Sequence, residues 1–150
     1  MRITCSSEIL KPPDSVFPWL AEPEKAMQWQ KNVKGGEILI DMPEVVGTTF
    51  TEVVEEGGNS LEMRGVITQY ARDRMIAFQL ESRIHTVDVS YSLEESLKTT
   101  KITVDANIRW KFPLSFLSLF IGRKMKAGIA RQMGSELREL KRICGAADDT

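Results

Sequence analysis

The stretch at residues 109–128, "RWKFPLSFLSLFIGRKMKAG", changes its hydrophobic period midway, and this change decides the fold. Just before and into it, "KITVDANIRWKF" (residues 101–112) alternates apolar and polar side chains, which is typical of a half-buried β-strand. From about Leu114 to Ile143, apolar side chains recur at the spacing of an α-helix. Pro113 separates the two patterns, because proline has no N–H to donate to a strand ladder. The sequence therefore predicts a last strand followed by a long amphipathic helix.

The apolar run from Phe112 to Ile121 is too short to cross a membrane. A membrane-spanning helix needs about 20 mostly apolar residues, and this run ends at Gly122, before the basic Arg123. We therefore expect no integral membrane association. A helix lying on a membrane surface stays open as an alternative, because basic residues follow the run directly.

Both predicted elements have one apolar face. In the strand, this face carries Ile102, Val104, Ala106, Ile108, Trp110 and Phe112, of which we expect the last two to end the strand pointing inward. In the helix, it carries Leu119, Ile129, Ala130, Met133, Leu137, Leu140 and Cys144. We expect the two faces to pack against each other.

The preceding sequence predicts a first strand at "RITCSSEIL" (residues 2–10) and then two short helices. Asp14 is the expected N-cap of the first helix, and Pro23 opens the second. Alternating segments with a hairpin turn at "EGGN" (residues 56–59) supply further strands. We predict one α+β domain over residues 1–150, in which about seven antiparallel strands curve around the long C-terminal helix. Residues from about 146 to 150 are expected to form a disordered tail.

Composition excludes several functions. The chain has 20 basic and 21 acidic residues, so no overall charge favours nucleic acid. Two cysteines and one histidine are too few for a Cys/His metal site, and we expect neither a metal nor a cofactor. The N-terminus lacks the apolar core of a signal peptide, which favours a cytoplasmic location.

The order of the elements resembles the SRPBCC superfamily, which has the helix-grip fold. That superfamily includes START-like lipid-transfer domains and polyketide cyclases and dehydrases. The similar segments are "PPDSVFPWLAEPEKAMQWQKNV" (12–33), "VGTTFTEVVEEGGNSLEMRGVITQYARDRMIAFQL" (46–80) and "YSLEESLKTTKITVDANIRW" (91–110). Within them, the matching positions are Pro13, Asp14, Phe17, Pro23, Trp29, Val46, Gly47 and the strand from Arg74 to Phe78.

The resemblance implies a ligand pocket between the sheet and the C-terminal helix. Small helix residues such as Gly122 and Ala127, opposite large apolar strand residues, support an unfilled volume. They fit equally a helix that approaches the sheet closely. The residues expected to bind the ligand are Trp29, Phe78, Leu80, Tyr91, Leu93, Ile108, Trp110, Phe112, Phe116, Leu119, Phe120, Ala127, Ala130, Met133 and Gly134.

The leading hypothesis is a protein that binds or transports a small hydrophobic molecule, such as a lipid, a sterol-like or a polyketide-like compound. One alternative is a cyclase- or dehydratase-type enzyme, whose catalytic residues the sequence does not identify. The other is a protein-interaction module similar to chaperone ATPase activators. His85 can be a general base or a turn residue, and Arg123 and Lys126 can meet a ligand or lie in solvent.

Overall fold

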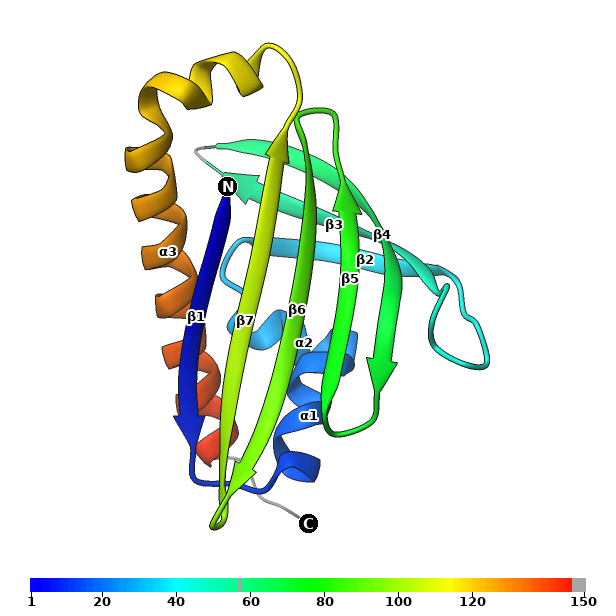
Figure 1. Ribbon diagram of the computed structural model, residues 1–150. Coiled ribbons are helices and arrows are strands. Elements are labelled where there is room, and N and C mark those ends of the chain that lie inside the picture. Colours follow the sequence, from blue (N-terminus) through cyan, green and yellow to red (C-terminus); the bar gives the residue numbers. More distant parts are fainter. Residues whose placement is uncertain (57, 147–150) are drawn as a thin grey trace.

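The computed structural model describes residues 1–56 and 58–146. The elements in chain order are β1 (Arg2–Ile9), α1 (Pro13–Ala21), α2 (Pro23–Trp29), β2 (Val33–Ile40), β3 (Thr49–Glu56), β4 (Asn59–Ala71), β5 (Met75–Glu81), β6 (His85–Ser96), β7 (Thr99–Trp110) and α3 (Leu114–Ala146). Figure 1 shows them as one curved sheet with a long helix beside it.

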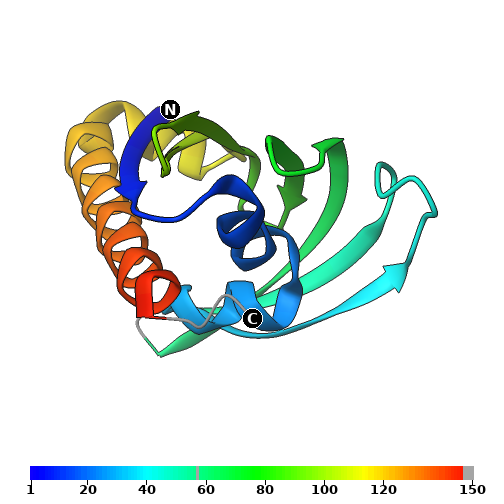
Figure 2. The ribbon, with the colours of Figure 1, turned by 90° about the horizontal axis from the view of Figure 1, so that it is seen from below.

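All neighbouring strands are antiparallel, in the order β1-β7-β6-β5-β4-β3-β2. The sheet curves so strongly that β2 and β3 lie across the direction of β1 and β7 (Figure 1). All three helices lie on the concave side, and α3 lies along the β1 edge (Figure 2). The predicted α+β architecture, with two short helices after the first strand, is confirmed.

The core lies between the concave face of the sheet and the C-terminal part of α3. Strand alternation buries Ile102 and Val104 on β7, while Lys101 between its buried neighbours stays exposed. On the helix side, Leu137 and Leu140 pack into the same cluster. Burial of such side chains contributes about 1.5–3 kcal/mol each. The predicted inward faces of these two elements are therefore correct in this part of the molecule.

Two boundaries differ from the prediction. Asp14 is not the N-cap of α1, because Pro12 occupies that position and no side chain caps it. The carboxylate of Asp14 instead lies in the first turn, where its negative charge interacts favourably with the positive end of the helix dipole. The long helix continues past Ile143 to Ala146, a residue that was expected to belong to the tail. The rest of that tail, residues 147–150, and Gly57 of the expected turn lie outside the described residues.

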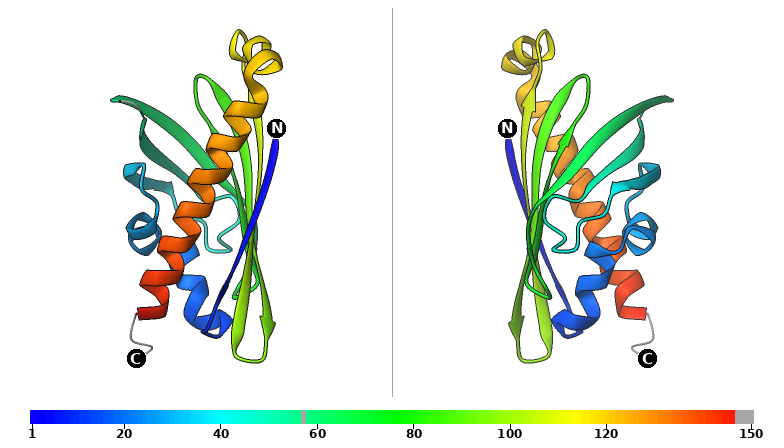
Figure 3. Two further views of the ribbon diagram at one scale, coloured as in Figure 1. Left: turned by 90° about the vertical axis from the view of Figure 1, so that its left-hand side faces the viewer. Right: turned by 90° about the vertical axis from the view of Figure 1, so that its right-hand side faces the viewer.

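The start of α3 does not pack as predicted. Strand β7 ends at Trp110, and Phe112, expected to point inward, is 85% exposed. Phe116, Leu119 and Phe120 are also exposed. The physical reason is visible in Figures 1 and 3, where the first turns of α3 pass beyond the end of the sheet before the helix descends along β1. These side chains consequently have no strand opposite them.

Candidate functional site

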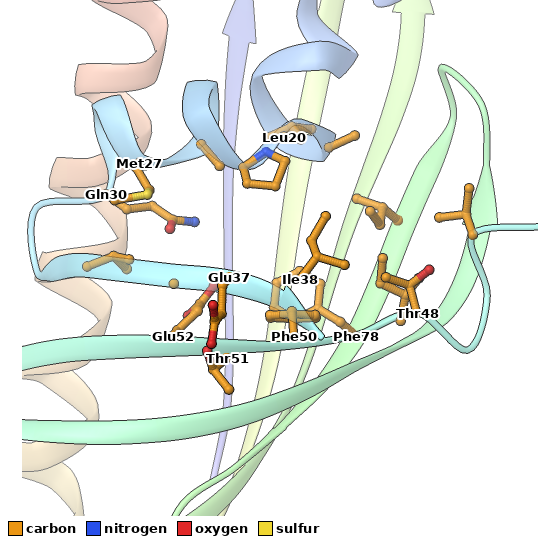
Figure 4. A pocket seen from close by; sticks show the side chains of 18 of the residues that line it. Leu20, Met27, Gln30, Glu37, Ile38, Thr48, Phe50, Thr51, Glu52 and Phe78 are labelled. Carbon is orange, nitrogen blue, oxygen red and sulfur yellow. The ribbon is translucent and has the colours of Figure 1, made fainter. Parts of the chain in front are cut away.

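A cavity of about 230 Å³ opens on the concave side of the sheet, between the two short helices and strands β2 to β6 (Figure 4). From the helices, Leu20, Ala26 and Met27 line it. From the strands, Phe50, Ile76 and Phe78 line it. Most of the wall is apolar, which suits a small hydrophobic molecule.

Strand pairing assembles the floor of this cavity. Ile76 is opposite Tyr91, and Ile67 is opposite Phe78, so side chains from β4, β5 and β6 meet on one face. The ring centroids of Phe50 and Phe78 are 5.9 Å apart, and those of Phe78 and Tyr91 are 6.0 Å apart. These distances are within the range of favourable aromatic pairs. The floor is therefore a row of rings contributed by three strands.

Gly65 makes room for the ring of Phe50. The two residues are paired across β3 and β4. A Cβ atom at position 65 would overlap the ring of Phe50. Glycine at this position therefore allows the Phe50 ring to lie over β4 and form a side of the cavity.

A partly buried carboxyl group lies in this mainly apolar wall. Glu52 lines the cavity two residues after Phe50, and strand alternation places both on the concave face. Burial, and to a smaller extent the nearby charge of Glu136, raises the pKa of Glu52 from its ordinary 4.5 to about 6. Glu52 can therefore exchange a proton or accept a hydrogen bond near neutral pH.

Glu136 of α3 lies beside the cavity wall. Burial raises its pKa, while a hydrogen bond from Gln132 (3.3 Å) and the charge of Lys31 oppose this rise. The Nζ atom of Lys31 also donates to Ser135 Oγ, at 2.6 Å. The two carboxyl groups repel each other when both are ionised, which favours a proton or a hydrogen-bond donor between them.

Tyr91 adds a hydroxyl group to the lining of the cavity. Burial raises the pKa of its hydroxyl, the charges of Glu136 and Glu52 add to the rise, and a hydrogen bond with Gln30 opposes it. Figure 4 shows the Gln30 side chain in the space between α2 and the strands that carry Glu37 and Glu52. Gln30, Glu52 and Tyr91 thus line the cavity. The other polar side chains that line it are Glu37, Asp41, Thr48 and Thr51. Within residues 1–56 and 58–146, no group of His, Cys, Asp or Glu side chains is arranged to hold a metal ion.

Only two of the residues predicted to bind a ligand, Phe78 and Tyr91, line this cavity. The remaining thirteen lie elsewhere. Trp29, Leu80, Leu93 and Ile108 are buried, whereas Trp110, Ala130, Met133 and Gly134 are half-buried. Phe112, Phe116, Leu119, Phe120 and Ala127 are exposed.

The C-terminal helix is not a wall of this cavity, in contrast to the expectation. No described side chain of α3 lines it, because α3 packs mainly against β1. The short helices α1 and α2 contact β6, β7 and β2 instead. The small residues of α3 do not face large strand residues either. A Cβ atom at Gly122 would meet nothing within 4 Å, and one at Gly134 would meet only the Arg138 side chain.

Several site residues were missed by the sequence analysis, chiefly Glu52, Gln30 and Phe50. A signal for Glu52 was present. The segment "TFTEVVEE" (residues 49–56) alternates, so Glu52 shares a face with Phe50 and Val54. Gln30 follows the last residue of a short helix and carries no comparable pattern.

The three residues whose roles were left open lie away from the cavity. His85 Nδ1 is 2.7 Å from Ser82 Oγ, and its ring lies 5.1 Å from that of Trp110. This is a hydrogen-bonded position at the start of β6. Arg123 and Lys126 are exposed on α3.

Within the described residues, no helix combines the length and the apolar character that crossing a membrane requires. This agrees with the expectation from the run at Phe112–Ile121.

The sequence matches one known protein family over most of its length. The sequence model of one family, described as activator of Hsp90 ATPase homolog 1-like protein, matches residues 11–144. None of the curated proteins matches the chain significantly.

Solved structures share the fold over nearly their whole length. TTHA0849 from Thermus thermophilus is 13% identical with a TM-score of 0.83, and the match covers 99% of this chain and 100% of that chain. The ZhuI aromatase/cyclase from a Streptomyces species is 14% identical with a TM-score of 0.77, covering 96% and 93%. A START superfamily protein from Mycobacterium smegmatis is 16% identical with a TM-score of 0.71, covering 96% and 94%. At these identities the likeness shows the fold alone, and the resemblance to the SRPBCC superfamily and its helix-grip fold is confirmed.

Proposed function

The chain belongs to the family of activator of Hsp90 ATPase homolog 1-like proteins, and from its apolar cavity we propose that it binds a small hydrophobic molecule that carries one hydrogen-bonding group. The apolar part of the ligand lies over the ring row of Phe50, Phe78 and Tyr91. Its polar group, a hydroxyl or an amine, donates to Glu52.

One observation carries this proposal: the mainly apolar cavity has a few polar side chains in its wall. The carboxyl of Glu52, the amide of Gln30 and the hydroxyl of Tyr91 all line the same space. A mainly apolar pocket with a few placed polar groups is the usual form of a small-molecule site. Cys5 and Cys144 are not joined by a disulfide, which agrees with the cytoplasmic location that we also propose.

The test is a cavity-filling substitution. Ala26 of α2 lines the cavity, so Ala26→Phe adds a ring where the ligand would lie. We expect it to weaken binding of the neutral fluorescent probe Nile red at least tenfold, about 1.4 kcal/mol. Native mass spectrometry of freshly purified wild type should reveal a co-purified hydrophobic molecule that is absent from the variant.

The matched control is Ala127→Phe, which adds the same ring at an exposed position of α3 outside the cavity. It should bind the probe as wild type does. Thermal unfolding of both variants checks that each is folded. Equal probe binding by wild type and folded Ala26→Phe would refute the proposal.

A cyclase- or dehydratase-type enzyme is the second candidate, and the position of Glu52 favours it. Such chemistry needs a cavity that folds a reactive chain and one group that exchanges protons. With a pKa of about 6, Glu52 can both donate and accept a proton near neutral pH. The distinguishing experiment incubates wild type and Glu52→Gln with a short linear polyketide analogue and follows loss of water by mass. Dehydration by wild type alone would establish the enzyme.

A further inference from the structure

The start of α3 presents an apolar surface to solvent. We call this surface the aromatic face, and it consists of Phe112, Phe116, Leu119, Phe120 and Ile121. Phe112 is 85% exposed, Leu119 is 79% exposed and Phe120 is 74% exposed. The rings of Phe116 and Phe120 lie edge to face with centroids 5.4 Å apart, so these two exposed side chains form one continuous apolar surface. Large exposed apolar patches on a protein usually mark an interaction site.

All charged residues in the segment of chain around this patch are basic. Residues 106–135 contain six Lys and Arg residues and no Asp or Glu. The rest of the chain has 14 basic and 21 acidic residues, a net charge of −7. A chain with a net charge of −1 thus concentrates a charge of +6 in this one segment. The segment attracts anionic partners although the whole chain does not.

The basic side chains adjoin the aromatic face. Arg123, Lys124 and Lys126 follow it within about one and a half turns of helix, and all three are exposed. Two other basic residues of the segment are engaged elsewhere, since Arg109 pairs with Asp88 at 3.0 Å and Lys111 with Glu81 at 3.7 Å. The aromatic face therefore has its own adjacent cationic group.

The patch is also accessible to a flat surface. Figures 1 and 3 show the first turns of α3 at one extremity of the molecule, beyond the strand ends and opposite the end where β6 turns into β7. No described side chain of α3 lines the cavity, so this segment is not part of the site proposed above.

We propose that the aromatic face and the adjacent basic residues Arg123, Lys124 and Lys126 dock the protein on the surface of an anionic lipid bilayer. The phenylalanine rings enter the headgroup region, and the basic side chains contact lipid phosphates. Surface-bound helices combine these two features, an apolar face and basic residues beside it. The run is too short to span, which leaves the helix in the plane of the surface. The adjacent basic side chains favour a lipid surface as the partner. An apolar patch on a partner protein would need only the apolar side chains.

The test measures co-sedimentation of the full chain with lipid vesicles. We expect binding to vesicles of phosphatidylcholine mixed with phosphatidylglycerol and much weaker binding to vesicles of phosphatidylcholine alone. Raising the salt concentration should weaken the binding, because salt screens exposed charges. Absence of binding to the anionic vesicles at low salt would overturn the proposal.

Two pairs of variants locate the binding surface. Arg123→Glu combined with Lys124→Glu should weaken binding at least about tenfold, and so should Phe116→Ser combined with Phe120→Ser. The matched controls lie far from the patch: Lys34→Glu combined with Lys98→Glu reverses the same charge, and Leu97→Ser removes another exposed apolar side chain. Both controls should bind as wild type does. If charge reversal at 123 and 124 has no larger effect than its control, the proposal is wrong.

A second copy of the chain is the competing occupant. Light scattering on the eluting protein would detect it as a dimer that Phe116→Ser with Phe120→Ser dissociates. Such a dimer would overturn the lipid proposal. Ala26→Phe should leave vesicle binding unchanged, so failure of the cavity proposal and failure of this one are distinguishable.

Discussion

At the scale of the residue, Glu52 is the least expected feature of the molecule. A carboxyl group in a mostly apolar wall loses hydration, which disfavours its charged form. The charge of the neighbouring Glu136 repels the ionised carboxylate of Glu52 and disfavours the charged form further. The chain therefore keeps a destabilising group at this position, which is what a binding or proton-transfer role would require.

The pH dependence of stability tests this reading of Glu52. Because its folded-state pKa is raised from 4.5 to about 6, its contribution to stability is complete below about pH 4.5 and is lost as the pH rises through 6. A glutamine side chain is similar in shape to a protonated carboxyl group and stays uncharged at every pH. We expect Glu52→Gln to match wild type at pH 4.5 and to exceed its free energy of unfolding by up to about 2 kcal/mol at pH 8.

Urea unfolding at both pH values measures this difference. Glu37→Gln is the control, since Glu37 lies on the neighbouring strand but is exposed. The difference between wild type and the Glu37 variant should not change with pH. A Glu52 variant whose stability follows wild type in parallel from pH 4.5 to 8 would contradict the assigned burial.

At the scale of the element, α3 has two parts with different partners. Its C-terminal part buries Leu137, Leu140 and Cys144 in the core, whereas its first turns carry the aromatic face. Between them, the carbonyl oxygen of Ala130 lies 4.0 Å from Cys5 Sγ on β1. At this point the helix approaches the edge of the sheet closely.

Ala130→Leu distinguishes close packing from an empty volume under the helix. If the helix packs on β1 there, the larger side chain should lower the free energy of unfolding by about 1–3 kcal/mol and leave probe binding unchanged. Ala127→Leu, at an exposed position, should change stability by less than about 0.5 kcal/mol. Thermal melts with and without Nile red give both readouts. A stable Ala130 variant that no longer binds the probe would place the ligand under α3 instead.

At the scale of the whole molecule, the sheet has two unequal edges. Strand β1 lies against α3, whereas β2 at the other edge is largely exposed from Gly36 to Ile40. Backbone amides of exposed edge strands open more readily than those of a packed core. The cavity lies at this weaker edge, so a ligand there would tie β2 and β3 to the short helices.

Hydrogen exchange should report this asymmetry. Without ligand, we expect amides of β6 and β7 to be the best protected and those of β2 the least. With a bound hydrophobic ligand, protection should rise in α2, β2 and β3 and stay unchanged in β1 and the C-terminal part of α3. Protection that rises instead along α3 and β1 would be evidence against the cavity described above.

The sequence by itself determined the kind and order of the elements. Local periodicity encodes whether a segment is a strand or a helix, so the alternation at residues 101–110 and the helical spacing after Leu114 both predicted the correct element. Resemblance to a superfamily then identified this arrangement as the helix-grip fold. The same alternation at residues 49–56 could also have identified Glu52 as an inward residue.

Only the tertiary structure decided where the cavity lies and which apolar residues remain exposed. A periodic pattern shows that a helix has an apolar face but not which strands that face will meet. Sheet curvature brings α3 to the β1 edge and leaves the short helices over the cavity. Phe112, Phe116, Leu119 and Phe120 were expected in a wall because they are apolar, yet apolar side chains also form much of any protein surface. Hydrophobicity favours burial, but the position of the neighbouring elements determines whether there is anything to be buried against.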